Sequence, residues 1–328
     1  MKQRTLGASG FEVSEIGLGC WQIGADWGKA LNDEQSIAIL EEAVKNGINF
    51  FDTADVYGNG RSETLIGKFL KQTDKTVRIA TKFGRNANVF PDKYSKDLLR
   101  ASVENALKRL GVPAIDLLQL HCVPFNVLKQ GAIFDWLRDL KSEGLITHFG
   151  ASVETVEEGL FCIEQEGLQS LQVIFNIFRQ KLVKELLPQA EENGVGIIVR
   201  LPLASGLLTG KFTKDTTFAK DDHRNYNKDG AMFNVGETFA GLPFEKGIDL
   251  VDTIKNDVLP DNLNMVQLAL RWILDHKAVS SIIPGASSPN QVISNASVSQ
   301  LEPLSKEVHN TLTQLYVDEI HENIRGVY

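Results

Sequence analysis

Four titratable side chains of complementary acid–base character stand at the ends of three short apolar segments. Asp52 closes the segment INFFD, Tyr57 follows five residues later, Lys82 closes VRIATK, and His121 follows IDLLQL. A phenol is a weak acid at neutral pH, but a nearby ammonium favours the phenolate and so lowers the phenol's pKa. Asp52 would balance the charge of Lys82, and His121 would hold a carbonyl oxygen by a hydrogen bond. Tyr57 is therefore predicted to donate the proton that a carbonyl oxygen takes up when hydride reaches its carbon.

Each of these residues also has an interpretation without catalysis. Asp52 and Lys82 could form a structural ion pair, His121 could be a satisfied core histidine, and Tyr57 could pack on a rim. The coincidence of all four at three consecutive segment ends favours a catalytic set. A rival hypothesis is an aldolase that uses Lys82 as a Schiff-base amine, but a paired Asp52 would oppose it by keeping the amine charged.

The elements that position these residues alternate along the chain. Helical patterns begin at caps such as Asn32, Ser95 and Asn264 and separate the apolar segments. Eight short segments read as strands buried on both faces: 15–19, 48–51, 77–82, 115–120, 146–152, 171–175, 195–200 and 279–284. We predict a (β/α)8 TIM barrel, in which catalytic residues lie at the carboxyl ends of the strands. An open doubly wound sheet is the alternative, but no GxGxxG follows the first strand.

Three segments depart from this alternation. Turn signals at Gly7 and Ser9-Gly10 predict an N-terminal hairpin that plugs the bottom of the barrel. Residues 201–260 read as a long polar insertion after the seventh strand, and residues 302–322 as an extra C-terminal helix. No low-complexity linker or internal repeat divides the chain, so residues 1–328 are expected to form a single domain.

Composition narrows the function classes. The chain has 328 residues and a formal net charge of −8, which disfavours binding to nucleic acid or to an anionic membrane. Cys20, Cys122 and Cys162 are widely spaced, so neither a metal site nor a disulfide framework is expected. The N-terminal segment has no hydrophobic signal core and no apolar run approaches 18 residues. We expect a cytoplasmic protein acting on a small molecule; nothing in the sequence predicts the oligomeric state.

Motifs along nearly the whole chain resemble the aldo-keto reductase superfamily, within it the branch of bacterial general stress reductases and potassium-channel β subunits. They include RTLGASGFEVSEIGLGCWQIG, FFDTADVYGNGRSETLIGKFL, ATKFG, IDLLQLHCV, GLITHFGAS, PLASGLLTGKF and IIPGASSPNQVISN. The resemblance implies that Asp52, Tyr57, Lys82 and His121 are the catalytic tetrad of an NAD(P)H-dependent carbonyl reductase. A nicotinamide-binding sensor or regulatory subunit with weak turnover is the second hypothesis.

The resemblance also implies a cofactor site for NADP(H), extended across the barrel mouth, with NAD(H) as an alternative. Cys20, Trp21 and Asp52 would lie beside the nicotinamide, and Ser152 and Gln172 would hold its carboxamide. The ribose and phosphates would lie along the segment that contains Arg200, Leu201, Leu203 and Ser205. Lys211 would reach a phosphate, and Arg224 would reach over the cofactor. Gly285, Ser287, Gln291 and Asn295 would surround the adenosine end.

Two departures from the family pattern concern this cofactor. Arg200 stands where many members have an aromatic residue that stacks on the nicotinamide; a guanidinium also stacks on flat rings. Gly285 and Gln291 stand where many members carry a lysine and an arginine for the 2′-phosphate. Ser288-Pro289 predicts a helix start there, whose free N–H groups favour a phosphate, although Gln291 could simply complete a capping box.

The substrate pocket is expected to be aromatic and apolar. Trp21, Trp27, Phe83 and Phe125 lie near the predicted strand ends and are candidates to line it. Each of them could equally pack on the rim. The sequence does not identify the substrate.

Overall fold

The computed structural model describes residues 1–24 and 31–328. Eight parallel strands form one sheet in the order of the chain. They are β3 (Leu18–Gly19), β4 (Phe50–Asp52), β5 (Arg78–Phe83), β6 (Ile115–His121), β7 (Ile146–Ser152), β8 (Leu168–Ile174), β9 (Gly196–Arg200) and β10 (Val279–Ile282). The sheet closes on itself, because Gly17 donates its N–H to the carbonyl of Ile282 at 2.7 Å and Gly19 bridges Gly285. The predicted (β/α)8 barrel is confirmed.

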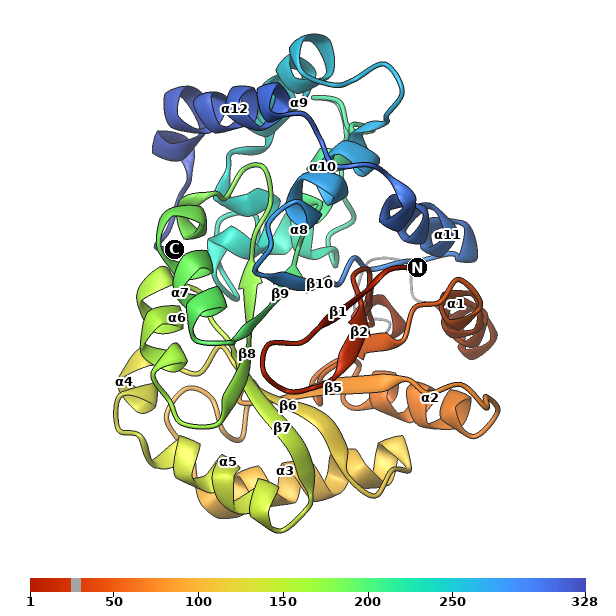
Figure 1. Cartoon of the computed structure of the whole chain (residues 1–328), viewed down its shortest axis with the longest axis vertical. Coiled ribbons are helices and arrows are strands. Elements are labelled where there is room, and N and C mark those ends of the chain that lie inside the picture. The colour runs from red at the N-terminus through yellow and green to blue at the C-terminus, as the bar shows by residue number, and fades with distance from the viewer. Residues whose placement is uncertain (25–30) are drawn as a thin grey trace.

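Helices surround the strands on the outside (Figure 1). They are α1 (Asp33–Lys45), α2 (Arg61–Leu70), α3 (Lys96–Leu110), α4 (Phe125–Leu128), α5 (Ala132–Ser142), α6 (Val156–Ile163), α7 (Leu186–Glu192), α8 (His223–Tyr226), α9 (Phe244–Asp257), α10 (Met265–Leu274), α11 (Pro289–Ser297) and α12 (Lys306–Leu315). The three predicted caps are present: Asn32 and Asn264 form capping boxes, and the Ser95 side chain accepts from Leu98 N–H.

The strand register explains why the polar residues converge. A separate apolar cluster includes Phe50, Ala80 and Leu117 of neighbouring strands together with Leu6 and Val13 of the N-terminal hairpin. Residues two apart on a strand share a face. The positions two residues further along these strands are Asp52, Lys82 and Gln119, all of which are buried. The same face of the sheet is therefore apolar near the hairpin and polar at the carboxyl ends of the strands.

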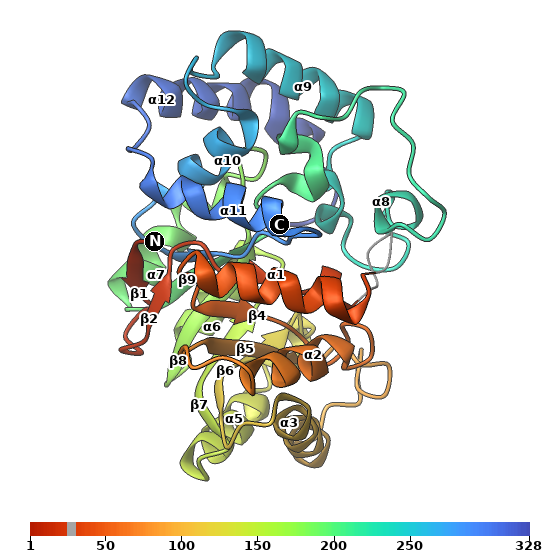
Figure 2. The same ribbon diagram turned by 90° about the vertical axis from the view of Figure 1, so that its right-hand side faces the viewer.

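The N-terminal hairpin closes the amino-terminal end of the barrel, as predicted. Its strands β1 (Gln3–Thr5) and β2 (Glu12–Ser14) pair antiparallel. Ser280 Oγ donates to the Thr5 carbonyl at 3.0 Å, and Ala8 N–H donates to the Gly194 carbonyl at 2.7 Å. A Cβ on Gly7 would lie 2.4 Å from the Gly194 oxygen, so only glycine fits this contact. Figure 2 shows the hairpin at one end of the barrel and α8 at the other.

The long insertion is more ordered than its polar composition suggests. It contains a 3₁₀ turn (Ala204–Thr209), the short helix α8 and the helix α9 of 14 residues. The sequence interpretation missed α9, although Ile248, Val251 and Ile254 are spaced as on one helical face and are buried. The extra C-terminal helix is confirmed as α12, which continues into a π-helical turn (Tyr316–Ile320).

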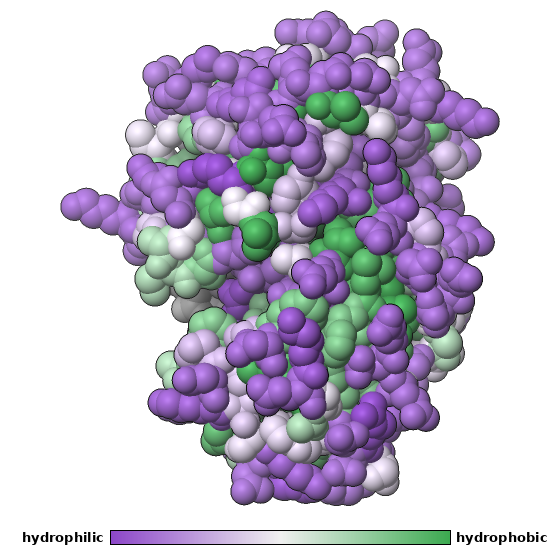
Figure 3. Space-filling model, turned by 90° about the vertical axis from the view of Figure 1, so that its left-hand side faces the viewer, coloured by the Kyte–Doolittle hydropathy of each residue, from purple (hydrophilic) through white to green (hydrophobic). Residues whose placement is uncertain are grey.

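The surface is mainly hydrophilic on the face drawn in Figure 3, where hydrophobic residues gather in a band near the middle. Within the described ranges, none of the helices combines the length and the apolar character that crossing a membrane requires.

Candidate active site

A buried ion pair lies at the carboxyl ends of β4 and β5. Lys82 Nζ donates to Asp52 Oδ1 at 2.5 Å, to the Thr53 carbonyl at 2.8 Å and to Tyr57 Oη at 3.3 Å. Burial alone would lower the pKa of Lys82, but Asp52 and Tyr57 outweigh it, and the pKa is raised. All three donors of the ammonium are used and the amine stays charged. This arrangement opposes the Schiff-base hypothesis, which needs a neutral nucleophilic amine.

Tyr57 is held between the ammonium and the indole of Trp21. The Trp21 and Tyr57 rings stack with centroids 5.9 Å apart, and Lys82 Nζ lies 4.9 Å from the Tyr57 ring centroid. Burial raises the pKa of Tyr57; the Lys82 charge lowers it, and Asp52 acts in the opposite direction. The expected net lowering is therefore not found, because desolvation of the phenolate outweighs the ammonium. The phenol stays protonated at neutral pH, as a proton donor must.

His121 faces the same phenol from the end of β6. Its ring centroid lies 6.1 Å from that of Tyr57, at an interplanar angle of 85°. Burial and the positive charges of Lys82, Arg85 and Arg200 hold the pKa of His121 well below its ordinary value, so the imidazole is neutral. Its Nδ1 atom is buried without a hydrogen-bond partner among the described residues. A neutral imidazole with free hydrogen-bonding capacity is suited to holding a polar group of a ligand.

Two amides fix the carboxylate of Asp52, and one of them was not anticipated. Gln119 Nε2 and Gln172 Nε2 donate to Asp52 Oδ2 at 2.9 and 2.7 Å, and Gln172 also donates to Gln119 Oε1 at 3.1 Å. Gln119 was missed, although it stands two residues before His121 on the same face of β6. Strand alternation was the signal that would have found it.

A cavity of about 710 Å³ lies over these residues at the barrel mouth. It reaches from Tyr57 and His121 to α11. Of the predicted cofactor residues, Ser152 does not line it. The others do: Cys20, Trp21, Asp52, Gln172, Arg200, Leu201, Leu203, Ser205, Lys211, Arg224, Gly285, Ser287, Gln291 and Asn295. Of the predicted aromatic residues, Trp21 lines the cavity, Phe83 and Phe125 do not, and Trp27 lies outside the described residues.

Several of these side chains already have partners within the protein. Arg224 pairs with Asp222 at 2.5 Å and lies 4.5 Å from the Phe218 ring centroid. Gln291 Oε1 accepts from Ser287 N–H and Oγ at 2.7 and 3.1 Å. The Ser288 side chain caps α11 as predicted, by accepting from Gln291 N–H. The Gln291 side chain bonds to Ser287 rather than to the backbone N–H of Ser288, so the capping box is not completed. α11 carries no charged residue.

The cavity residues fit a nicotinamide dinucleotide. The α11 end offers neutral hydroxyl and amide groups, including the buried side chain of Asn295, and a helix N-terminus. Lys211 and Arg224 supply cationic groups among the residues that line the cavity. Leu201, Ala204 and Ser205 have positive φ values of 52°, 48° and 56°, a strained geometry that is common at ligand-binding segments.

A second charged group stands beside the cavity and was missed in the sequence. Glu237 pairs with Arg85 at 3.1 Å and with Arg200 at 3.4 Å, and Arg85 also pairs with Glu154 at 2.6 Å. Donor atoms of Cys122, Glu154 and Glu237 lie within 4.8 Å of one another, but the two guanidinium groups already balance the carboxylates. Glu237 comes from the polar insertion, where no local pattern marks it.

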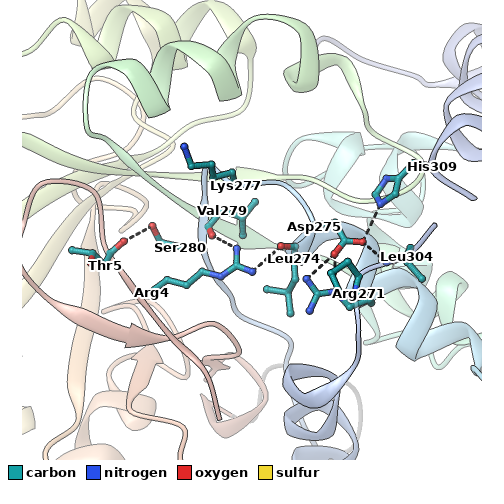
Figure 4. A pocket seen from close by; sticks show the side chains of 11 residues that line it. Arg4, Thr5, Arg271, Leu274, Asp275, Lys277, Val279, Ser280, Leu304 and His309 are labelled. Carbon is teal, nitrogen blue, oxygen red and sulfur yellow. Dashed lines mark hydrogen bonds and ion pairs between the residues drawn. The ribbon is translucent and has the colours of Figure 1, made fainter. Parts of the chain in front are cut away.

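A further cavity, of about 670 Å³, lies at the opposite end of the barrel (Figure 4). There Arg4 donates to the carbonyls of Leu274 and Val279, both at 2.7 Å. Asp275 accepts from Arg271 at 2.9 Å and from Leu304 N–H at 2.9 Å, and His309 lies at the same distance. These hydrogen bonds pair the polar side chains with groups of the protein and hold the N-terminal hairpin and α12 against the end of α10. We therefore assign this cavity a structural role.

Comparison with known proteins agrees with this geometry. Residues 15–317 match the model of the "Aldo/keto reductase family". "Uncharacterized oxidoreductase YqkF" of Bacillus subtilis is 30% identical over 332 residues, 99% of this chain and 100% of that protein. "NADH-specific methylglyoxal reductase" of Escherichia coli is 31% identical over 312 residues, 90% and 92% of the two chains.

A solved structure shares the fold across its whole length. The glycerol dehydrogenase AKR11B4 from Gluconobacter oxydans superposes with a TM-score of 0.80 at 27% identity, covering 99% of this chain and 98% of that one. A probable potassium-channel β subunit of Arabidopsis thaliana also matches, at 28% identity over 99% of this chain, in line with the branch suggested by the motifs. The chain belongs to the aldo/keto reductase family.

Proposed function

We propose that this protein reduces small aldehydes and ketones to alcohols with NADPH, and that Tyr57 is the general acid. The observation that carries the proposal is the contact of a buried, protonated phenol with a buried ammonium, 3.3 Å from Tyr57 Oη to Lys82 Nζ. A reduced nicotinamide, when bound, supplies the hydride for the carbonyl carbon. Every other contribution comes from side chains of the protein.

Each of the four polar side chains has its own role in the transfer of one proton. His121 orients the carbonyl oxygen through its neutral ring, and Tyr57 Oη transfers its proton to that oxygen. Lys82 stabilises the phenolate that remains, since its charge favours the ionised phenol. Asp52, held by two amides, keeps Lys82 charged and in position.

The adenosine end of the cavity, where a 2′-phosphate would bind, is formed largely by uncharged residues. Lys211 and Arg224 support phosphate binding, but the neutral α11 leaves little positive charge around the adenosine end. The preference for NADPH over NADH is therefore expected to be small, and a relative named as NADH-specific agrees with NADH as an alternative donor.

A sensor with weak turnover is the second candidate, and similarity to channel β subunits favours it. The intact proton-donor geometry speaks for catalysis instead.

Since the described cysteines are all free of disulfide bonds, we also propose a reducing, cytoplasmic location.

Turnover separates the two candidates. NADPH and NADH oxidation are followed at 340 nm with methylglyoxal and a nitrobenzaldehyde at substoichiometric enzyme. We expect many turnovers per active site with both cofactors. Tight cofactor binding with less than one turnover across the carbonyl panel would overturn the reductase proposal and support the sensor.

A further inference from the structure

Glu237 presents a buried carboxylate to the cavity that contains Tyr57 and His121. The residue is 7% exposed and lines the same cavity as the phenol and the imidazole. In its ion pairs with Arg85 and with Arg200, the contacting oxygen is Oε1. An ionised carboxylate has about four acceptor positions on its two oxygens, more than these two pairs need. A hydrogen-bond acceptor is thus available beside the proposed proton donor.

Backbone contacts hold this carboxylate in a fixed place. Ser205 Oγ donates to the Glu237 carbonyl at 2.9 Å, and Glu237 N–H donates to the Asn234 carbonyl at 3.0 Å. A Cβ on Gly236 would lie 1.8 Å from Arg179 Nη1, so the turn before Glu237 is packed tightly against a buried guanidinium. A fixed acceptor can discriminate between ligands because the protein does not rearrange around the wrong one.

A donor accompanies the acceptor. Arg200 also lines the cavity, and its Nε is buried without a partner among the residues that the structure describes. The pKa of Glu237 is lowered: burial opposes ionisation, but Arg200 and Arg85 outweigh it. The cavity wall therefore carries an ionised acceptor and a cationic donor side by side.

We propose that Glu237 and Arg200 recognise a hydroxyl group of the substrate, so that hydroxylated aldehydes and ketones are preferred over their alkyl analogues. A hydroxyl donates one hydrogen bond and accepts others, which matches a carboxylate beside a guanidinium. An alkyl group at the same place would displace water from both charged groups without forming a hydrogen bond to either of them. The inference rests on the proposed reductase function and assigns the substrate class of the same site.

Other substrate chemistries fit this wall less well. A carboxylate on the substrate would meet the negative charge of Glu237, and a purely apolar substrate would leave two buried charged groups without new partners. A site built to bond a hydroxyl discriminates strongly against analogues that lack it. For one charge-assisted hydrogen bond, we expect a preference of about 10- to 100-fold in kcat/KM.

The test compares two ketones of nearly equal shape, hydroxyacetone and butanone, which differ by a hydroxyl in place of a methyl. The intrinsic reactivity of each ketone cancels when the ratio of their kcat/KM values is compared between enzymes. Glu237→Gln keeps the shape but removes the charge, and Glu154→Gln is the matched control, because it also removes a partner of Arg85 but does not line the cavity.

We expect the wild-type ratio to favour hydroxyacetone, Glu237→Gln to reduce the ratio by about tenfold or more, and Glu154→Gln to leave it within about twofold. Equal loss of the ratio in both variants, or an unchanged ratio in Glu237→Gln, would overturn the proposal. If Glu237→Gln does not fold, Glu237→Asp is tested instead, because its shorter side chain draws the carboxylate oxygens back toward the backbone. Turnover of methylglyoxal without any preference for hydroxyacetone would refute this inference alone, whereas no turnover of any carbonyl would refute the proposed function.

Discussion

Replacing Asp52 by alanine should destabilise the protein far more than the loss of an ordinary ion pair. The Asp52 and Lys82 side chains are 3% and 1% exposed, and their charges lie 2.5 Å apart. Without Asp52, the ammonium of Lys82 is buried among groups that do not neutralise it, and Gln119 and Gln172 each lose an acceptor. Breaking a buried pair on one side costs about 3–5 kcal/mol. We expect a loss of that size in the free energy of unfolding.

Urea unfolding followed by tryptophan fluorescence and circular dichroism at neutral pH measures this loss. Asp139→Ala is the matched control, because Asp139 pairs with Lys96 at a similar distance, 2.7 Å, but both side chains are about half exposed; its loss should stay below about 1 kcal/mol. The double variant Asp52→Ala/Lys82→Met should recover part of the lost stability, because the unpaired charge is gone. If Asp52→Ala costs no more than Asp139→Ala, the reasoning about the buried charge is wrong.

Two further predictions concern titration and packing. His121 should remain neutral at pH 6, because burial and nearby cations depress its pKa; an NMR titration midpoint near 6.5 would contradict this. As the pH falls, the histidine of the unfolded chain is protonated before the buried one, which favours the unfolded state. The free energy of unfolding should therefore decrease as the pH falls below about 6.5, and urea midpoints at pH 7 and 5.5 would show the decrease. Gly67→Ala should cost about 1–3 kcal/mol by overpacking, since a Cβ there would lie 2.2 Å from the Arg109 carbonyl; unchanged thermal unfolding would refute the contact.

Local patterns were sufficient to predict the barrel. Buried parallel strands read as short apolar runs, and caps such as Asn32 and Asn264 mark helix starts through contacts only three residues long. The convergence of Asp52, Lys82 and His121 followed from topology alone, since strand ends meet at one rim of a barrel. The strand order β3 to β10 agrees with that reasoning.

Features that depend on distant contacts were not predictable in the same way. The net effect on the pKa of Tyr57 depends on how completely the phenol is buried, which no spacing reveals. Glu237 reaches the cavity only because the insertion folds back across the mouth, where Ser205 fixes its backbone. Ser152 stands at a strand end as predicted, but does not line the cavity. These positions are set by tertiary packing rather than by local sequence.

The most direct test of the central claim is single-turnover hydride transfer in Tyr57→Phe, with NADPH binding measured by fluorescence titration on the same preparation. Phenylalanine keeps the ring that stacks on Trp21 but removes the proton. We predict a rate of carbonyl reduction about 10²- to 10⁴-fold below wild type, the usual contribution of a general acid, with the cofactor Kd changed by less than about threefold. Hydride transfer at the wild-type rate would show that Tyr57 is not the proton donor.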